Sequence, residues 1–220
     1  MIIERALLAT PAELGEAVAA RLAARAQEPL TVALTGGSAA KLVHPPLARA
    51  GVDWARVTLF FGDERAVPPD HADSNFRLAR ETLLDAAGVP AARVHRMRGE
   101  AADLAAAARE YEALLPPALD IVLLGMGPDG HVCSLFPGHA LLGERARLVG
   151  VVEDSPKPPP RRLSLTMPAL AAAREVWFVL AGADKAAPAR ALADPASELP
   201  GPQVARAATT RVFLDRAAGE

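Results

Sequence analysis

The chain has 220 residues, with 24 Lys and Arg against 26 Asp and Glu, and a formal net charge of −2. A nearly neutral chain has no general attraction to nucleic acid or to an anionic membrane, so any anion must be bound by a local site. The single cysteine excludes an intrachain disulfide framework and a zinc site built from cysteines, as is typical of a reducing compartment.

The start of the chain shows neither an export signal nor a membrane anchor. Glu4 and Arg5 interrupt the first apolar residues before a signal-peptide core can form. The longest apolar runs, around Ile121–Leu124 and Val176–Leu180, are far shorter than the roughly 20 residues of a membrane-spanning helix. We therefore expect a soluble cytoplasmic protein, and the length without repeats predicts one domain over residues 1–220.

Short β-favouring apolar runs alternate with Ala-, Leu- and Arg-rich stretches of helical period. The alternation predicts an α/β fold, with a mostly parallel twisted sheet and helices on both faces. In chain order we expect an edge strand at Ile2–Leu8, a helix at Ala12–Ala26, strands at Leu30–Leu34 and Val57–Phe61, helices at Ser74–Leu84 and Asp103–Leu115, strands at Ile121–Leu124, Leu148–Val152, Leu163–Thr166 and Val176–Leu180, a helix at Lys185–Leu192 and a strand at Val212–Leu214. Ligands of open sheets bind beyond the carboxyl ends of the strands, so the residues after each strand are the candidate site.

The first candidate segment, Thr-Gly-Gly-Ser at residues 35–38, follows a predicted strand and precedes a helical stretch. Gly36 and Gly37 allow an anion to approach the backbone closely, and free N–H groups at a helix start complement its charge. Ser38 adds a hydroxyl donor. The segment resembles a phosphate site, but on this motif alone an ordinary tight turn between a strand and a helix is favoured, because short glycine motifs have many false positives.

The second segment, Phe61–Pro69, also follows a strand and contains the run Asp63, Glu64, Arg65. Three charged residues leaving an apolar strand seldom serve packing, and the planar guanidinium of Arg65 suits a phosphate or a carboxylate. The alternative is a solvated turn with a local ion pair.

The third segment, Gly125–Gly138, is a glycine-rich turn after an apolar strand. Its glycine spacing fits a dinucleotide fingerprint, but Asp129 would put a carboxylate at the pyrophosphate position and Pro137 would break the following helix. The turn instead holds the imidazole of His131 next to a carboxylate. A neutral histidine has an ordinary pKa of about 6.5, so we predict that His131 is a general base.

The fourth segment, Asp154–Leu163, is rich in proline and carries Lys157, Arg161 and Arg162. Prolines stiffen the backbone and would hold these cations in fixed directions, which favours an anion site. A stiff solvated linker or a proline-rich ligand for another protein is the alternative. Lys185, which follows a later strand, is a weaker candidate for the same pocket.

Other chemistries have less support in the sequence. Neither Ser38 nor Ser134 has the Gly-x-Ser-x-Gly setting of a serine hydrolase. Cys133 lies only two residues from His131, and a buried free cysteine is usually a small hydrophobe. No His-x-x-x-His or similar metal spacing is present, so we expect neither a metal nor a cofactor.

Together, in this order, the segments resemble the 6-phosphogluconolactonase family. The resemblance spans nearly the whole chain and rests on Leu34–Ser38, Phe60–Arg65 with Val67–Pro68 and Ser74–Asn75, Leu124–His131 with Ser134–Pro137, and Ser155–Pro160 with Arg162. It implies a fold similar to glucosamine-6-phosphate deaminase and hydrolysis of 6-phosphoglucono-1,5-lactone in the pentose phosphate pathway. His131 would be the base, with Asp129 and Arg65 beside it, and the substrate and its phosphate would meet Gly36, Gly37, Ser38, Asp63, Lys157, Arg162 and Lys185.

The sequence departs from the family pattern at one point, and two rival functions share part of that pattern. The family usually continues the glycine turn with Thr-Pro, whereas Ala39 and Ala40 stand here, so one hydroxyl that could bind phosphate is missing. An amino-sugar-phosphate deaminase is the first rival. In such enzymes the segment around the histidine resembles Asp-Gly-His-Ile-Ala-Phe-Asn-Glu-Pro-Gly, in which the glutamate assists the histidine, whereas residues 134–137 here read Ser-Leu-Phe-Pro. A sugar-phosphate sensor is the second. We expect a small phosphorylated lactone as the ligand, no nucleic acid or membrane partner, and a monomer.

Overall fold

A parallel sheet lies at the centre of the molecule. The computed structural model describes residues 1–220. Its main sheet has six strands in the order β1-β9-β8-β5-β2-β3, and every neighbouring pair is parallel. The strands are β1 (Ile2–Leu8), β2 (Leu30–Leu34), β3 (Val57–Phe61), β5 (Ile121–Leu124), β8 (Glu175–Leu180) and β9 (Thr210–Asp215). The predicted fold class is confirmed.

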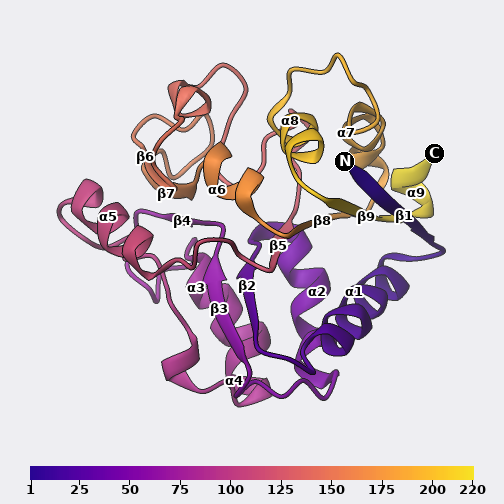
Figure 1. Cartoon of the computed structure of the whole chain (residues 1–220), viewed down its shortest axis with the longest axis horizontal. Helices are drawn as coiled ribbons and strands as arrows, with labels where there is room; N and C mark the ends of the chain where they lie inside the picture. Colours follow the sequence, from indigo (N-terminus) through magenta and orange to yellow (C-terminus); the bar gives the residue numbers. More distant parts are fainter.

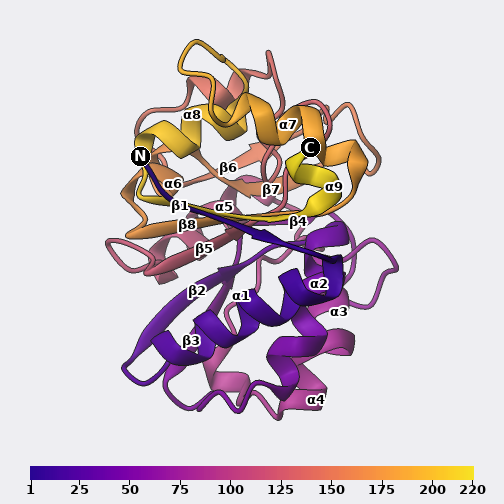
Figure 2. The same cartoon turned by 90° about the vertical axis from the view of Figure 1, so that its right-hand side faces the viewer.

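Helices cover both faces of this sheet (Figures 1 and 2). One face carries α1 (Pro11–Arg25), α2 (Gly37–Arg49) and the continuous run of α3 (Asn75–Ala79), the π-helical turn η1 (Arg80–Leu84) and α4 (Asp85–Ala87). The other carries α5 (Leu104–Leu114), α6 (Met167–Ala172), α7 (Ala186–Ala191), α8 (Pro200–Ala207) and α9 (Arg216–Gly219). Short 3-10 turns lie at η2 (Ala91–Arg93), η3 (Ala140–Gly143) and η4 (Ala183–Lys185). No helix combines the length and the apolar character that crossing a membrane requires.

Burial on both faces explains why the strands read as continuous apolar runs. In β5, Ile121 and Leu123 pack into the core beneath α1 and α2, whereas Val122 and Leu124 pack into the core on the opposite face. All four side chains are at most 1% exposed. Because successive side chains of a strand point to opposite faces, a central parallel strand must be apolar at every position.

A second, smaller sheet differs from the sequence-based prediction. The predicted strands at 148–152 and 163–166 do form, as β6 (Val149–Val152) and β7 (Arg162–Leu165), but they pair antiparallel with each other. The segment for which a solvated turn was the alternative becomes a third strand, β4 (Asp63–Arg65), antiparallel to β7. The partners in the β4–β7 pair lie about a hundred positions apart, which no local pattern records.

The predicted helices are present, with small shifts at their ends. Thr10 caps α1 by accepting a hydrogen bond from the backbone N–H of Glu13, and Ser74 caps α3 in the same way through Arg77. Such capping fixes the start of α3 at the end of the loop, residues 66–74, that follows the charged strand β4. The short helices α6, α8 and α9 were not predicted. The 13-residue helix α2 was expected only as a helical stretch without bounds after residues 35–38, and it contains Pro45 and Pro46, which obscure a helical pattern.

His44 of α2 is completely buried beside the π-helical turn. The hydroxyl of Thr82 donates to the carbonyl of Leu78 at 2.6 Å and lies 2.9 Å from His44 Nδ1, so Nδ1 carries the proton and donates to Thr82. The other ring nitrogen, Nε2, is buried without a hydrogen-bond partner. Burial lowers the pKa of His44 from 6.5 to about 4.

This buried neutral histidine predicts a loss of stability at acidic pH. Unfolded histidine takes up a proton below its ordinary pKa while folded His44 does not, so its contribution, present above pH 6.5, is lost as the pH falls toward about 4. The full loss is about 3 kcal/mol. Urea unfolding between about pH 7.5 and about pH 4.5 measures it, and the variant His44→Leu isolates it. An identical pH dependence in both proteins would contradict the prediction.

Candidate functional site

A cavity of about 240 Å³ opens where β2, β3 and β5 end and the small sheet begins. The chain runs from β2 to β3 on one side and later places β5 on the other side of β2, so the cavity lies at the switch point of the strand order. Its lining includes Thr35, Gly36, Gly37, Ser38, Ala39, Gly62, Asp63, Arg65, Gly125, Met126, Gly127, Pro128, His131, Cys133, Lys157, Arg162 and Lys185. The structure therefore brings together in the cavity lining every predicted site residue except Asp129, which contacts His131.

The His131 imidazole is paired with the Asp129 carboxylate. Their Nδ1 and Oδ1 atoms are 2.5 Å apart, and the Lys157 ammonium lies 3.2 Å from Asp129 Oδ2. A contact this short requires a proton between the nitrogen and the carboxylate oxygen, so Nδ1 donates to Asp129. His131 Nε2 then carries a lone pair, and it has no hydrogen-bond partner within the protein.

The surrounding charges keep this pair in a definite protonation state. Burial alone would raise the pKa of Asp129, but hydrogen bonds from His131 and Lys157 overcome it and lower that pKa to about 2. The pKa of His131 is lowered: burial is the largest cause, Lys157 adds to it, and Asp129 opposes it. Near neutral pH the site thus holds an ionised Asp129 and a neutral imidazole.

Close packing around the ring explains the composition of the glycine turn. A Cβ atom at Gly127 would come within 2.1 Å of His131 Nδ1, so only glycine leaves room for the imidazole. On its other side the ring packs on Phe136, with ring centroids 4.7 Å apart. Gly130 has a φ of 78°, which turns the chain back toward the strand end. The ring is therefore held in one place by its neighbours.

The glycine turn after β2 forms the start of α2 and lines the same cavity as His131. Gly36 is the N-cap and Gly37 has a φ of 63°, a conformation that few other residues adopt. The first N–H groups of a 13-residue helix have no partner within the helix, and they open onto the cavity with Ser38. Backbone groups of this kind complement a phosphate. Ala39 and Ala40, which replace the expected Thr-Pro, are buried.

Two of the four cavity cations remain available to an anion. Arg65 donates through Nη1 to the carbonyl of Asp73 at 2.6 Å, but its Nε is buried without a partner. Lys185 is largely buried and pairs with the exposed carboxylate of Asp184 at 2.8 Å. Because Asp184 is itself solvated, this pair contributes little and Lys185 can turn toward a ligand.

Arg162 makes its hydrogen bonds mainly with the proline-rich segment. Its Nε and Nη2 donate to the carbonyls of Lys157, Pro158 and Pro159 at 2.9, 3.0 and 2.9 Å respectively. Its Nη1 lies 3.9 Å from the carboxylate of Asp63. The guanidinium thus holds the fourth segment against β4, and the predicted stiffness of that segment comes from this arginine as well as from the prolines.

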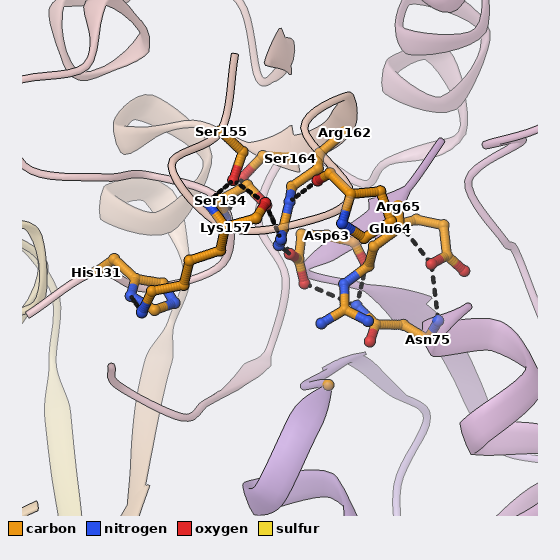
Figure 3. A network of polar contacts seen from close by, with 12 residues as sticks. Asp63, Glu64, Arg65, Asn75, His131, Ser134, Ser155, Lys157, Arg162 and Ser164 are labelled. Atoms are coloured by element: carbon orange, nitrogen blue, oxygen red, sulfur yellow. Dashed lines mark hydrogen bonds and ion pairs between the residues drawn. The ribbon is translucent and has the colours of Figure 1, made fainter. Parts of the chain in front are cut away.

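Asp63 lies at the centre of a buried polar network (Figure 3). Its carboxylate accepts hydrogen bonds from Asn75 Nδ2 at 2.9 Å and from Ser134 Oγ at 2.7 Å. The backbone N–H of Ser134 in turn donates to Ser164 Oγ at 3.1 Å. The network joins β4, the start of α3, the His131 turn and β7. Three polar members lie outside the charged run, namely Asn75, Ser134 and Ser164. The sequence predicted no functional role for them, because only their burial in the structure reveals that they hold these segments together.

Glu64 serves the local structure and does not line the cavity. It is 3% exposed, and its carboxylate accepts four hydrogen bonds, from the backbone N–H groups of Arg65, Asn75 and Phe76 and from the hydroxyl of Ser74. Burial raises the pKa of Glu64, and these bonds oppose the rise. The carboxylate fixes the start of α3 relative to β4 and so supports Arg65.

Cys133 lies in the cavity wall, but its environment suppresses thiolate chemistry. Burial, reinforced by the nearby Asp63 carboxylate, raises the pKa of the thiol well above its ordinary value. A protonated thiol is a poor nucleophile. No three His, Cys, Asp or Glu side chains converge in a way that could hold a metal ion.

An imidazole–carboxylate pair facing a cationic cavity at the carboxyl edge of a parallel sheet defines an enzyme site for a small anionic substrate. The sequence profile described as glucosamine-6-phosphate isomerases/6-phosphogluconolactonase matches residues 5–213. The chain belongs to this family.

Relatives and solved structures agree with this assignment. The 6-phosphogluconolactonase of Mycobacterium tuberculosis is 43% identical over 82% of this chain and 80% of its own, and that of Rattus norvegicus is 41% identical over 96% and 91%. The chain spans 56% of the length of a rice relative named probable 6-phosphogluconolactonase 3, chloroplastic, at 42% identity over 78% of this chain. The structure of 6-phosphogluconolactonase from Trypanosoma brucei superposes with a TM-score of 0.84 at 29% identity, covering 98% of this chain and 97% of that one.

The fold is also shared with a deaminase. A monomeric glucosamine-6-phosphate deaminase superposes with a TM-score of 0.85 at 21% identity, over 98% of each chain. At this identity the likeness concerns the fold alone. The predicted resemblance to both groups of the family is confirmed.

Proposed function

We propose that this chain is a 6-phosphogluconolactonase that hydrolyses 6-phosphoglucono-1,5-lactone to 6-phosphogluconate in the pentose phosphate pathway. Relatives of that name, at 41–43% identity and covered over 80% and 91% of their own lengths, support the reaction. The observation on which the mechanism depends is the unpartnered Nε2 of the neutral His131, at the wall of a cavity lined by four cationic side chains.

In the proposed mechanism His131 Nε2 removes a proton from a water molecule, and the resulting hydroxide attacks the lactone carbonyl. Asp129 accepts the Nδ1–H bond, which fixes the tautomer and stabilises the imidazolium that forms. Negative charge then develops on the carbonyl oxygen, and Arg65 is the nearby cation with an unused N–H group. Collapse of the tetrahedral intermediate breaks the ring C–O bond, and the proton on Nε2 passes to the departing alkoxide.

The distant phosphoryl group would be held at the start of α2. The free N–H groups after Gly36, together with Ser38 and Lys185, supply hydrogen bonds and positive charge at one end of the cavity. His131 lines the same cavity but not the recess that Ser38 and Lys185 share, so a ligand anchored there can present its other end to the base. Binding energy from the phosphate then orients the ring for attack.

The rival deaminase reaction has less support. The residues after His131 lack the expected glutamate, and the only carboxylate in the cavity lining, that of Asp63, is occupied by Asn75 and Ser134. A sensor without catalysis would not need the His131–Asp129 pair. We further propose that the protein acts as a cytoplasmic monomer of one domain, although some plant relatives carry the word chloroplastic in their names.

A rapid assay with freshly prepared 6-phosphogluconolactone tests the proposed function. We expect hydrolysis well above the spontaneous rate, unaffected by a chelator, and no ammonia from glucosamine 6-phosphate. Ammonia release would favour the deaminase, and tight binding without turnover would favour the sensor. Loss of activity with chelator would contradict a metal-free mechanism.

A further inference from the structure

Three hydrogen bonds fix the backbone of Lys157. Its N–H donates to Ser155 Oγ at 3.1 Å, and its carbonyl accepts from that same hydroxyl at 2.8 Å and from Arg162 Nη2 at 2.9 Å. Arg162 is 4% exposed and is held near Asp63. The direction in which the Lys157 side chain leaves the loop is therefore set by buried polar groups.

The side chain of Lys157 extends from this loop to His131 (Figure 3). Its ammonium lies 3.2 Å from Asp129 Oδ2, 3.4 Å from Asp129 Oδ1 and 3.2 Å from His131 Nδ1. His131 Nδ1 already donates to Asp129, so the lysine donates to the carboxylate and merely lies close to the ring nitrogen. All short polar contacts of the ammonium are thus made with the catalytic pair.

We propose that Lys157 is a positioning residue of the proposed lactonase, which locks Asp129 in place and disfavours an imidazolium at His131, and that it is not the phosphate ligand. The inference rests on the proposed function and assigns a role within that site. To reach a phosphate at the start of α2, the ammonium would have to leave two carboxylate contacts. Arg65 has an Nε without a partner, and Lys185 would give up only its pair with the exposed carboxylate of Asp184.

The sign of the effect follows from the charges that face His131. Asp129 from the same turn and Asp63 from β4 raise the pKa of His131, whereas Lys157 from the proline segment lowers it. Arg65, Arg162 and Lys185 line the same cavity, the neighbouring Cys133 is neutral, and Phe136 carries no charge. Removing the Lys157 ammonium leaves Asp129 unopposed, so the imidazole should accept a proton at higher pH.

The test compares the wild-type protein with Lys157→Met, Lys157→Arg and Lys185→Met. NMR titration of the His131 ring without substrate, assigned with His131→Gln, reports the protonation directly, and kcat/KM against pH reports it through activity. In Lys157→Met we expect both titrations to move to higher pH, so that kcat/KM at about pH 6 relative to about pH 8 falls roughly threefold or more. Lys157→Arg should restore most of the wild-type profile.

Lys185→Met is the matched control, because this lysine lines the cavity but pairs with Asp184. It should raise KM without moving the His131 titration. The same behaviour in Lys157→Met, a higher KM with an unchanged titration, would overturn the proposal and make Lys157 a phosphate ligand. An absence of lactonase activity in the wild type would overturn the proposed function instead, while the NMR shift would still support the positioning contact.

Discussion

Replacing His131 by alanine is expected to lower kcat/KM for the lactone by about 10²- to 10⁴-fold, because it removes the only unpartnered base in the cavity. The fold should persist, since the ring lies at the cavity wall. The measurement is initial-rate hydrolysis with the spontaneous rate subtracted. In the wild type, kcat/KM should also fall as the pH drops through the lowered pKa of His131.

His139 offers a matched control for this substitution. It also pairs with a carboxylate, that of Asp154 at 2.9 Å, but it lies outside the cavity. His139→Ala should therefore keep kcat/KM within about twofold of wild type. If His131→Ala retained turnover similar to that of His139→Ala, the general-base role would be refuted.

Replacing Glu64 is expected to destabilise the protein more than any other single change in the charged run. Glu64→Ala leaves the backbone N–H groups of Arg65, Asn75 and Phe76 without their acceptor, at a cost of about 3 kcal/mol or more. Glu64→Gln keeps the volume, but its amide N–H must face at least one donor, at a cost of about 1–3 kcal/mol. Denaturant unfolding measures both.

Glu16→Gln is the control for an ordinary carboxylate. Glu16 pairs with Arg49 at 2.9 Å, and both side chains are about two-thirds exposed, so its loss should change the unfolding free energy by less than about 1 kcal/mol. Comparable values for Glu64→Gln and Glu16→Gln would show that the four hydrogen bonds at Glu64 contribute nothing measurable.

The sequence predicted the main sheet and the site well because both depend on local patterns. A strand such as Ile121–Leu124 is apolar at every position only when both faces of its sheet are buried. In such a parallel sheet the carboxyl end of the strand marks the site. Gly36 and Gly37 stand just after such a strand, and His131 lies in the glycine-rich turn that follows another. Their meeting in one cavity therefore follows from strand order, once the sheet is recognised as parallel.

The features that the sequence did not reveal depend on contacts between distant segments. The run Asp63–Arg65 becomes a strand only because β7 lies beside it. Lys157 was expected to meet the phosphate since charge alone was visible, whereas its ammonium lies against Asp129, 28 positions away. Burial of Glu64 and of Asn75 was equally hidden, because a charged or amide side chain gives no periodic signal when it is buried singly.

The cavity draws its wall from residues scattered between Thr35 and Lys185 and from both sheets. No fragment of the chain could therefore form the cavity, and partial unfolding of either sheet would disrupt it. A ligand that occupies this cavity binds the native chain alone, and at a concentration of about 100 times its Kd it adds about 2.7 kcal/mol to the free energy of unfolding. Supply of its own metabolite thus becomes a determinant of how long the protein survives in a cell.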